Sequence, residues 1–336
     1  MSGSVAREEA ALADALHMAC SRIGDGRIAQ VRRLSAGASQ EIWSFDLMTA
    51  TSRHPLILRR APAGLRADSE TNTLDMEAAL LRHVAPHGVP VPAVRLVLAP
   101  DDSLGEGYLM DRVEGETLPP RIMRQPEFAP ARAAFPEQAG VILANIHRVP
   151  CDDLALPTRS PTELIALTEA RYRARDMPRP VFDLALRWLE DNLPPAVTPR
   201  LVHGDFRNGN LMFGPEGIRA VLDWELAHKG DPLEDLGWLT VPSWRFGAID
   251  LPAGGLGRLE PLLEAYESQT GPVDRAALRF WQVYGTLRWG AMCAAMTKWV
   301  EDGTDPTPER AMIARRGSET ELDLLDLLRE REARDA

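Results

Sequence analysis

The chain has 336 residues, of which 45% are hydrophobic and 26% charged, and these values are ordinary for a soluble globular protein with room for two lobes or domains. Its formal net charge of −11 at pH 7 argues against the basic surface that a nucleic-acid-binding or anionic-membrane-binding protein needs. We therefore expect neither a nucleic acid nor a membrane as a partner.

The cysteines and the lengths of the apolar runs indicate in which cellular compartment the protein is expected. Cys20, Cys151 and Cys293 are odd in number and widely spaced, so they form neither a metal motif nor a disulfide framework. The N-terminal stretch lacks a basic-then-apolar leader pattern, and no apolar run approaches the ~20 residues that a membrane helix requires. The sequence predicts a soluble, cytoplasmic protein.

The first elements along the chain predict a small lobe that begins with a helix and a strand pair. Apolar residues over Val5–Ser21 have helical spacing, and Gly24–Gly26 ends that helix. Strands are expected at Ala29–Leu34 and Glu41–Leu47, joined by the small-residue loop Ser35–Gln40. Such a loop lets backbone N–H groups approach phosphates, and a plain hairpin connection is the alternative.

A third strand follows at Leu56–Arg60. Because side chains alternate along a strand, Ile57 and Arg59 share one face of it. The remaining elements predicted for the small lobe are a helix and two strands, at Asp68–Val84, Val94–Leu98 and Gly107–Met110.

The rest of the chain is mostly helical in pattern, on both sides of a central polar loop. The predicted helices are Phe128–His147, Glu163–Arg173, Pro180–Asn192, Leu259–Gln269, Asp274–Trp299 and Pro308–Arg331. A further helix start is expected at Asp231-Pro232, since proline suits the first turn. No Walker or Rossmann glycine motif occurs, so phosphate binding has to come from other groups.

The central stretch predicts a strand, a polar loop and a hairpin. Arg200–His203 leads into the loop, and Leu211–Phe213 and Ile218–Leu222 are the hairpin strands, with Gly214–Gly217 as the turn between them. The loop carries Asp205 and, five positions later, Asn210, while Asp223 follows the second hairpin strand.

These three side chains match the needs of phosphoryl transfer. The reaction requires a carboxylate that receives the proton of the attacking hydroxyl and oxygen ligands that hold Mg²⁺ on the phosphates. The pattern H-x-D-x-x-x-x-N followed by a strand-end aspartate supplies these groups in the order that kinases use. We predict Asp205 as the catalytic base and Asn210 and Asp223 as magnesium ligands. A lone HGD triplet is typical of a capped turn, so the complete set carries this prediction.

With these motifs the sequence resembles the aminoglycoside phosphotransferase and choline kinase-like family. Its HGDxxxxN loop corresponds to His203–Asn210, and its IDWE-type strand end corresponds to Leu222–Glu225. The resemblance extends from about Ile28 to about Trp299. It is greatest to the branch found fused to acyl-CoA dehydrogenases and as stand-alone bacterial phosphotransferases.

The resemblance implies where ATP binds in the small lobe. Arg59 stands where kinases in general place a lysine, and Glu77 is expected to form an ion pair with it. At the hinge, the backbone groups of Asp111 and Val113 would contact the adenine. The nucleotide-binding positions implied are Ser35, Gly37, Ala38 and Ser39 in a phosphate flap, then Ile57, Arg59, Glu77, Asp111 and Val113.

In the large lobe the resemblance implies supporting and acceptor-binding residues. His203 and Asp235 would support the catalytic loop, and His147, in an LAxLH-like segment, would be structural. The candidate acceptor-binding residues are Trp244, Arg245 and Arg288. Core packing is the alternative for Trp244, and the two arginines favour an anionic or neutral acceptor over a cationic one.

The expected fold is therefore α+β and protein-kinase-like, with a small antiparallel-sheet N-lobe over residues 1–112 and a mainly helical C-lobe over 113–336. The expected activity is ATP- and Mg²⁺-dependent transfer of the γ-phosphate to a hydroxyl of an aminoglycoside-like compound, a hydroxyacyl-CoA or another alcohol metabolite. A nucleotide-binding pseudokinase with a regulatory role is the alternative. A protein kinase fits less well, because only about 18 residues separate the two aspartates and no A-P-E motif follows. The oligomeric state stays open.

Overall fold

The computed structural model describes residues 12–34, 40–61, 71–174 and 177–329, and it divides into two compact units. Residues 1–115 and 219–227 belong to unit 1, and residues 116–218 and 228–336 belong to unit 2. The predicted lobe boundary had assigned 219–227 to the second lobe. The segment lies in unit 1 because the backbone N–H of Val221 donates to the carbonyl of Pro90 at 2.8 Å, and that of Asn72 donates to the carbonyl of Glu225 at 2.7 Å.

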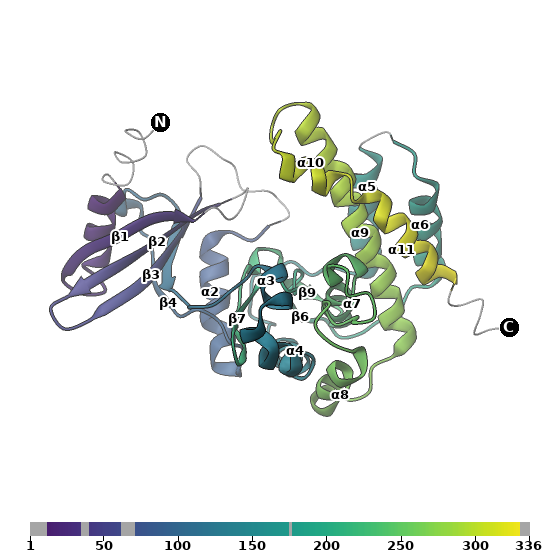
Figure 1. Ribbon diagram of the computed structural model, residues 1–336, viewed down its shortest axis with the longest axis horizontal. Coiled ribbons are helices and arrows are strands. Elements are labelled where there is room, and N and C mark those ends of the chain that lie inside the picture. Colours follow the sequence, from purple (N-terminus) through teal and green to yellow (C-terminus); the bar gives the residue numbers. More distant parts are fainter. Residues whose placement is uncertain (1–11, 35–39, 62–70, 175–176, 330–336) are drawn as a thin grey trace. The chain divides into compact units, whose positions relative to one another are not determined.

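Unit 1 is built on a five-stranded antiparallel sheet with the order β1-β2-β3-β5-β4 (Figure 1). Its strands are β1 (Gly26–Leu34), β2 (Glu41–Thr49), β3 (Arg53–Arg60), β4 (Val94–Val97) and β5 (Gly107–Asp111). Each corresponds to a predicted strand, and the antiparallel pairing agrees with the sheet expected for the small lobe.

The alternation of side chains sorts this sheet into a core face and a polar face. Trp43, Phe45 and Leu58 are almost fully buried and pack with the helix over residues 12–20 in one apolar cluster. Burying side chains of this size stabilises a fold by roughly 2 kcal/mol each. Arg59, one position beyond Leu58, projects from the opposite face. The apolar pattern of β2 and β3 therefore fixes the direction of Arg59.

Helix α2 (Leu74–Val84) begins later than the predicted start at Asp68. The side chain of Thr73 accepts a hydrogen bond from the backbone N–H of Met76 at 3.3 Å and thereby caps the helix. Helix α2 packs on β4 and β5, and its buried face carries Glu77.

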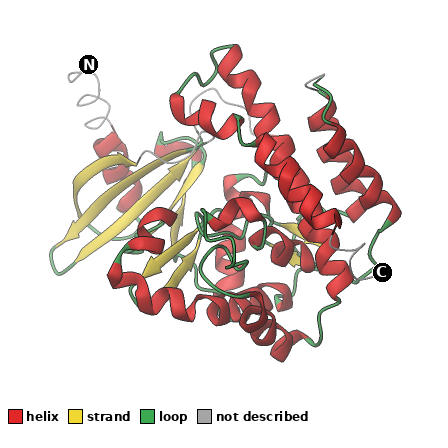
Figure 2. Cartoon of the chain, turned by 45° about the vertical axis from the view of Figure 1, so that its right-hand side comes forward, coloured by secondary structure: helices red, strands yellow, loops and turns green. Residues whose placement is uncertain are grey.

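Unit 2 is mainly helical (Figure 2). Its α-helices are α3 (Pro119–Arg124), α4 (Ala129–Arg148), α5 (Pro161–Arg173), α6 (Pro180–Asp191), α7 (Leu233–Leu239), α8 (Leu259–Thr270), α9 (Arg275–Glu301), α10 (Pro308–Ala314) and α11 (Gly317–Arg329). Helix α9 packs against α5, α7, α10 and α11. Among the described residues, no helix is both long enough and apolar enough to cross a bilayer.

The single helix predicted over Pro308–Arg331 is wrong, because the structure has two helices there, α10 and α11. Close packing on α9 explains the break. A Cβ atom on Gly290 of α9 would lie 2.3 Å from the hydroxyl of Thr320 on α11, so the two helices approach closely at this point. Helix α11 starts at Gly317, where a continuous helix would be weakened by the poor helix propensity of glycine.

Two short sheets flank the central polar loop. The predicted hairpin is confirmed as β7 (Leu211–Gly214) and β8 (Gly217–Val221). Strand β6 (Arg200–Val202) pairs with β9 (His228–Gly230) in an antiparallel sheet. Strand β9 was not predicted, because three residues are too few to show an alternating pattern.

Candidate active site

The loop between β6 and β7 is held by one buried carboxylate. The backbone N–H groups of His203 and Gly204 donate to Asp235 of α7, at 2.8 Å to Oδ2 and 2.9 Å to Oδ1. Gly204 has φ +80°, a left-handed conformation that glycine adopts without strain. Asp235 thus clamps the start of the loop through the backbone, in the way expected of a supporting residue.

Asp235 keeps its negative charge although it is completely buried. Burial by itself would raise the pKa of Asp235, but the hydrogen bonds from His147 and from the His203 backbone outweigh it and hold this pKa below its ordinary value. The Nε2 atom of His147, on α4, lies 3.0 Å from Asp235 Oδ2. The buried position of His147 agrees with the structural role predicted for it.

Asp235→Asn is expected to lower the free energy of unfolding by about 3 kcal/mol, since one oxygen acceptor is replaced by an NH₂ group that faces buried donors. The pKa of Asp235 is depressed in the folded state, so the ionised carboxylate adds to the free energy of unfolding above about pH 4. This contribution is lost as the pH falls through the folded pKa. Urea unfolding at pH 7 and pH 3.5 measures both effects. Asp191→Asn, at the exposed end of α6, is the matched control, and an equal effect in both variants would contradict the clamp.

The loop also orients the side chain of Asp205, which is 14% exposed. Its Oδ2 accepts a hydrogen bond from the amide nitrogen of Asn210 at 2.5 Å. Its Oδ1 accepts from Nε of Arg207 at 3.0 Å and from the indole Nε1 of Trp238 at 2.7 Å. The structure therefore brings Asp205 and Asn210 together and fixes the carboxylate in one orientation.

The sequence did not identify Trp238 and Arg207 as partners of Asp205. Arg207 lies two positions after Asp205, and this spacing is the only signal that could have indicated it. Trp238 comes from α7, 33 positions away, and carries no such signal. Its ring stacks with the guanidinium of Arg288, whose carbon lies 4.5 Å from the ring centroid.

The three candidate acceptor-binding residues are engaged within unit 2. Trp244 is 3% exposed and packs on Trp238, as its core-packing alternative predicts. Arg245 donates to the carbonyls of Thr240 at 3.0 Å and Ile249 at 2.9 Å. The partly buried Arg288 donates to the carbonyl of Gly204 at 3.0 Å. These contacts engage both guanidinium groups within unit 2, and the preference for an anionic or neutral acceptor stays a prediction.

In unit 1, a second group of polar side chains surrounds Arg59, whose side chain is 9% exposed. Nε of Arg59 lies 3.1 Å from Oε2 of Glu77, which confirms the predicted ion pair. One terminal nitrogen of Arg59 lies 2.7 Å from Oδ1 of Asp223 and 3.6 Å from Oε2 of Glu225. Gln40, which the sequence did not single out, accepts a hydrogen bond from Nε.

Burial and charge compete in this cluster. Burial raises the pKa of Glu77 to about 7, even though the cation of Arg59 acts in the opposite direction. For Arg59, burial alone would lower the pKa, but the carboxylates of Glu77 and Asp223 outweigh it and hold this pKa above its ordinary value. Arg59 is thus a permanently charged cation whose position depends on buried carboxylates.

Asp223 sits two residues after the end of β8, where the chain turns. Its backbone has φ 65° and ψ 65°, a left-handed conformation that aspartate tolerates better than most residues. The following residue, Trp224, donates its backbone N–H to Oε1 of Glu77 at 3.3 Å. This turn presents the Asp223 carboxylate, with 32% of its side chain exposed, beside Arg59.

The remaining nucleotide-binding predictions lie around β3 and β5. Ile57, 7% exposed, pairs with Met110 across the sheet. The backbone N–H of Asp111 donates to the carbonyl of Ala93 at 2.9 Å, so an adenine contact at Asp111 would have to use its carbonyl. Val113 is partly exposed in the segment after β5. Ser35, Gly37, Ala38 and Ser39 of the predicted flap lie outside the described residues.

The sequence and the fold were compared with known proteins. The family model described as "Phosphotransferase enzyme family" matches residues 30–281. Among curated relatives, acyl-CoA dehydrogenase family member 10 of Mus musculus is 32% identical over 194 residues. That alignment covers 54% of this chain but only 18% of the mouse protein, so the chain spans a minor part of this relative.

Solved structures agree in fold over nearly the whole chain. A Ralstonia eutropha structure assigned as an aminoglycoside phosphotransferase is 22% identical with a TM-score of 0.76, and the match covers 94% of this chain and 98% of that one. An aminoglycoside phosphotransferase variant solved with AMP-PNP and hygromycin B is 16% identical with a TM-score of 0.60, over 94% and 98% of the two chains. The predicted α+β, protein-kinase-like fold is confirmed by these similarities.

Proposed function

Because the chain belongs to the phosphotransferase enzyme family, we propose that it transfers the γ-phosphate of ATP to a hydroxyl group of a small molecule. The observation that carries this proposal is the Asp205 carboxylate, which three donors orient in a loop that Asp235 clamps. A solved structure of similar fold holds AMP-PNP and hygromycin B, which supports a nucleotide and a small-molecule acceptor here as well.

In this proposal Asp205 acts on the acceptor. Its carboxylate accepts the proton of the acceptor hydroxyl while the oxygen bonds to the γ-phosphorus and the bond from that phosphorus to the ADP oxygen breaks. Asn210, Arg207 and Trp238 hold the carboxylate in one orientation, so it needs no rearrangement at the moment of reaction.

Arg59 and the predicted metal ligands would act on the phosphates. The fixed cation of Arg59 would bind phosphate oxygens, and Glu77 holds it in place. The predicted magnesium ligands carry oxygen donors of the kind that Mg²⁺ prefers, a carboxylate on Asp223 in unit 1 and an amide oxygen on Asn210 in unit 2. When bound, Mg²⁺ would neutralise charge on the phosphates during transfer.

The class of acceptor is the open part of the proposal. The internal engagement of Arg245 and Arg288 weakens the reason to prefer an anionic or neutral acceptor over a cationic one. Curated relatives bear the name of acyl-CoA dehydrogenase family members, which supports testing hydroxyacyl-CoA thioesters beside aminoglycosides and other alcohol metabolites.

An ADP-release assay with Mg-ATP over these three groups of compounds tests the proposed function. We expect one group to raise ADP release well above the rate without acceptor, with the phosphorylated product visible by mass spectrometry. Saturable Mg-ATP binding without any phosphorylated product would instead support a nucleotide-binding pseudokinase. Absence of nucleotide binding would contradict both functions.

Trp238→Phe is expected to lower kcat about tenfold with little change in KM, because the ring still fills its site but no longer donates to Asp205. Trp289→Phe is the matched control. Trp289 belongs to the same aromatic cluster, and its indole N–H has no acceptor among the residues that the structure describes. Equal losses in the two variants would show that packing, rather than the hydrogen bond to Asp205, matters.

A further inference from the structure

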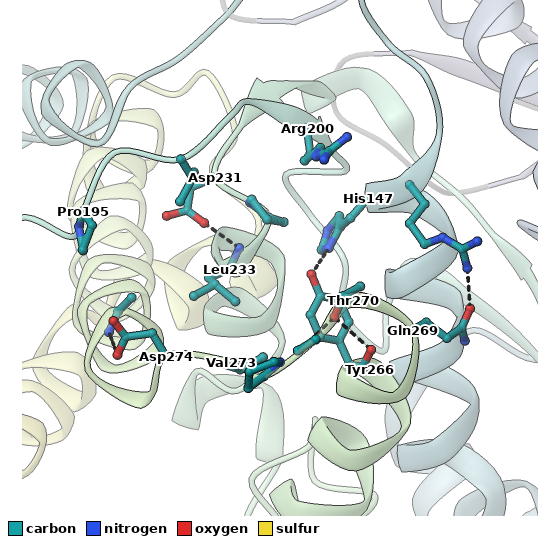
Figure 3. Close-up of a pocket in the computed structure, with 16 residues that line it drawn as sticks. His147, Pro195, Arg200, Asp231, Leu233, Tyr266, Gln269, Thr270, Val273 and Asp274 are labelled. Carbon is teal, nitrogen blue, oxygen red and sulfur yellow. Dashed lines mark hydrogen bonds between the residues drawn. The ribbon is translucent and has the colours of Figure 1, made fainter.

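Unit 2 contains a cavity of about 610 Å³ that none of the roles above uses. It lies between the end of α4, the start of β6, the start of α7, the end of α8 and the start of α9. Figure 3 shows Pro195 and Asp231 on one side of it and His147 and Tyr266 on the other. A volume of this size is within the range of sites for small organic ligands.

The charged side chains that line the cavity differ in whether they have hydrogen-bond partners. Asp231 accepts hydrogen bonds from the backbone of Leu233 at 2.9 Å and from the indole of Trp281 at 2.9 Å. Asp274 caps α9. Arg200, an exposed residue at the start of β6, has in contrast no hydrogen bond or ion pair from its guanidinium group among the described residues. The cavity therefore offers one unused cation, while its carboxylates are already engaged.

Arg148, the second cation of the wall, donates to the side chain of Gln269 at 2.9 Å. A free guanidinium can pair with a carboxylate through two parallel N–H···O hydrogen bonds. The rest of the wall combines apolar side chains, among them Val197, Leu233 and Val273, with polar ones such as Gln269 and Thr270. The cavity wall thus carries two arginines and two aspartates, and among these four side chains Arg200 alone has no hydrogen-bond partner in the described part of the chain.

We propose that this cavity binds a small organic carboxylate whose anionic group pairs with Arg200 and whose apolar body lies against Leu233 and Val273. This site goes beyond the proposed phosphoryl transfer, because it uses none of the groups assigned to ATP or to the acceptor.

A continuous set of hydrogen bonds connects the cavity wall to the catalytic loop. The hydroxyl of Tyr266 and Nδ1 of His147 lie 2.8 Å apart, and both side chains line the cavity. Nε2 of His147 lies 3.0 Å from Asp235, which accepts from the backbone N–H groups of His203 and Gly204. A ligand that packs on Tyr266 and His147 therefore restrains Asp235, which holds the loop. Binding in the cavity should then change the hydrogen exchange of the His203 and Gly204 backbone amides.

Isothermal titration of the full chain with 4-phenylbutyrate tests the site, with the uncharged and equally shaped 4-phenylbutanamide as the comparison probe. We expect saturable binding of the carboxylate with a Kd below about 1 mM and binding of the amide that is about tenfold weaker. Arg200→Gln should weaken carboxylate binding about tenfold and leave amide binding unchanged. Arg187→Gln, an exposed arginine of α6 outside the cavity, should bind both probes like the wild type.

Two further measurements separate this cavity from other sites. Val273→Trp, which fills the cavity from its partly exposed rim, should abolish binding, and circular dichroism verifies its fold. Hydrogen exchange of the peptide over residues 201–211 should slow about twofold or more when the carboxylate binds. Neither measurement depends on phosphoryl transfer. A negative result would therefore count against the cavity site and would leave the proposed phosphotransferase function untouched.

The proposal is overturned if no saturable binding of 4-phenylbutyrate occurs, if Arg200→Gln and Arg187→Gln bind it equally, or if Val273→Trp binds it like the wild type. Displacement of the probe by ATP would equally overturn it, because the probe would then occupy the nucleotide site.

Discussion

Asp205→Asn is expected to lower the rate of phosphoryl transfer about 10³-fold, because the amide cannot accept the proton of the acceptor hydroxyl. Asparagine has nearly the same shape, and its oxygen can still accept from Trp238 and Arg207. The Asn210 amide nitrogen loses its carboxylate acceptor but keeps its hydrogen bond to the backbone carbonyl of residue 205, so the loop should keep its conformation at a modest cost in stability. The KM for ATP should change little, since the nucleotide contacts proposed here involve other residues. Steady-state kinetics with the acceptor identified in the screen, together with thermal unfolding, measures these effects.

Asp191→Asn is the control for the same chemical change on an exposed surface, and it should retain full activity. A rate for Asp205→Asn within about threefold of the wild type would remove Asp205 from the role of base, because general base catalysis contributes at least about 10²-fold. Loss of Mg-ATP binding in this variant would point to a disrupted loop instead.

Arg59→Met is expected to destabilise the protein by about 3–5 kcal/mol at pH 8.5, because Glu77, 1% exposed, is left as a buried charge without its cation. The KM for ATP should also rise, since the proposed phosphate-binding cation is gone. Urea unfolding and nucleotide titration measure the two effects independently.

The stability effect should depend on pH in a defined direction. Burial already raises the pKa of Glu77 to about 7 with Arg59 present, and removing the cation raises this pKa further. A folded pKa above the unfolded value of about 4.3 gives stability that is lost as the pH rises through the folded pKa. The loss caused by Arg59→Met should therefore be smaller at pH 6 than at pH 8.5, because Glu77 takes up a proton at the lower pH.

A double-mutant cycle isolates the pair. Arg59→Met with Glu77→Gln should recover about 2 kcal/mol relative to the sum of the single changes and should remove the additional pH dependence. Arg95→Met breaks an exposed ion pair with Asp111 in the same sheet and should cost less than about 1 kcal/mol. Additive effects of the two changes in the cycle would contradict coupling between Arg59 and Glu77.

The local patterns of the sequence were sufficient for the strands of the small sheet and for the central hairpin. Alternation along β3 placed Arg59 on the face opposite Leu58, and the spacing of Asp205 and Asn210 placed them in one loop, where the structure brings them together. These predictions succeed because side-chain direction along a strand and separation within a short loop are properties of the local backbone.

Contacts between segments far apart along the chain could not be predicted from the sequence. The break between α10 and α11 depends on close packing at Gly290, and the indole of Trp238 reaches Asp205 from 33 positions away. Arg288 and Arg245 were candidates for pairing with an anionic or neutral acceptor, and the structure shows their guanidinium groups donating to carbonyls inside unit 2. The composition of a segment does not reveal which carbonyls the fold will bring to it.

The sequence by itself indicated the kind of chemistry, because Asp205 and Asn210 are oxygen-bearing groups held in one short loop and Asp223 supplies a third such group. Only the tertiary structure decided which side chains hold that chemistry in place. Trp238, Arg207 and Asp235 fix the Asp205 loop, and Glu77 fixes Arg59. The reason is physical: a buried charge is stable only where the fold supplies its partners, and here most of those partners come from elements far apart along the chain.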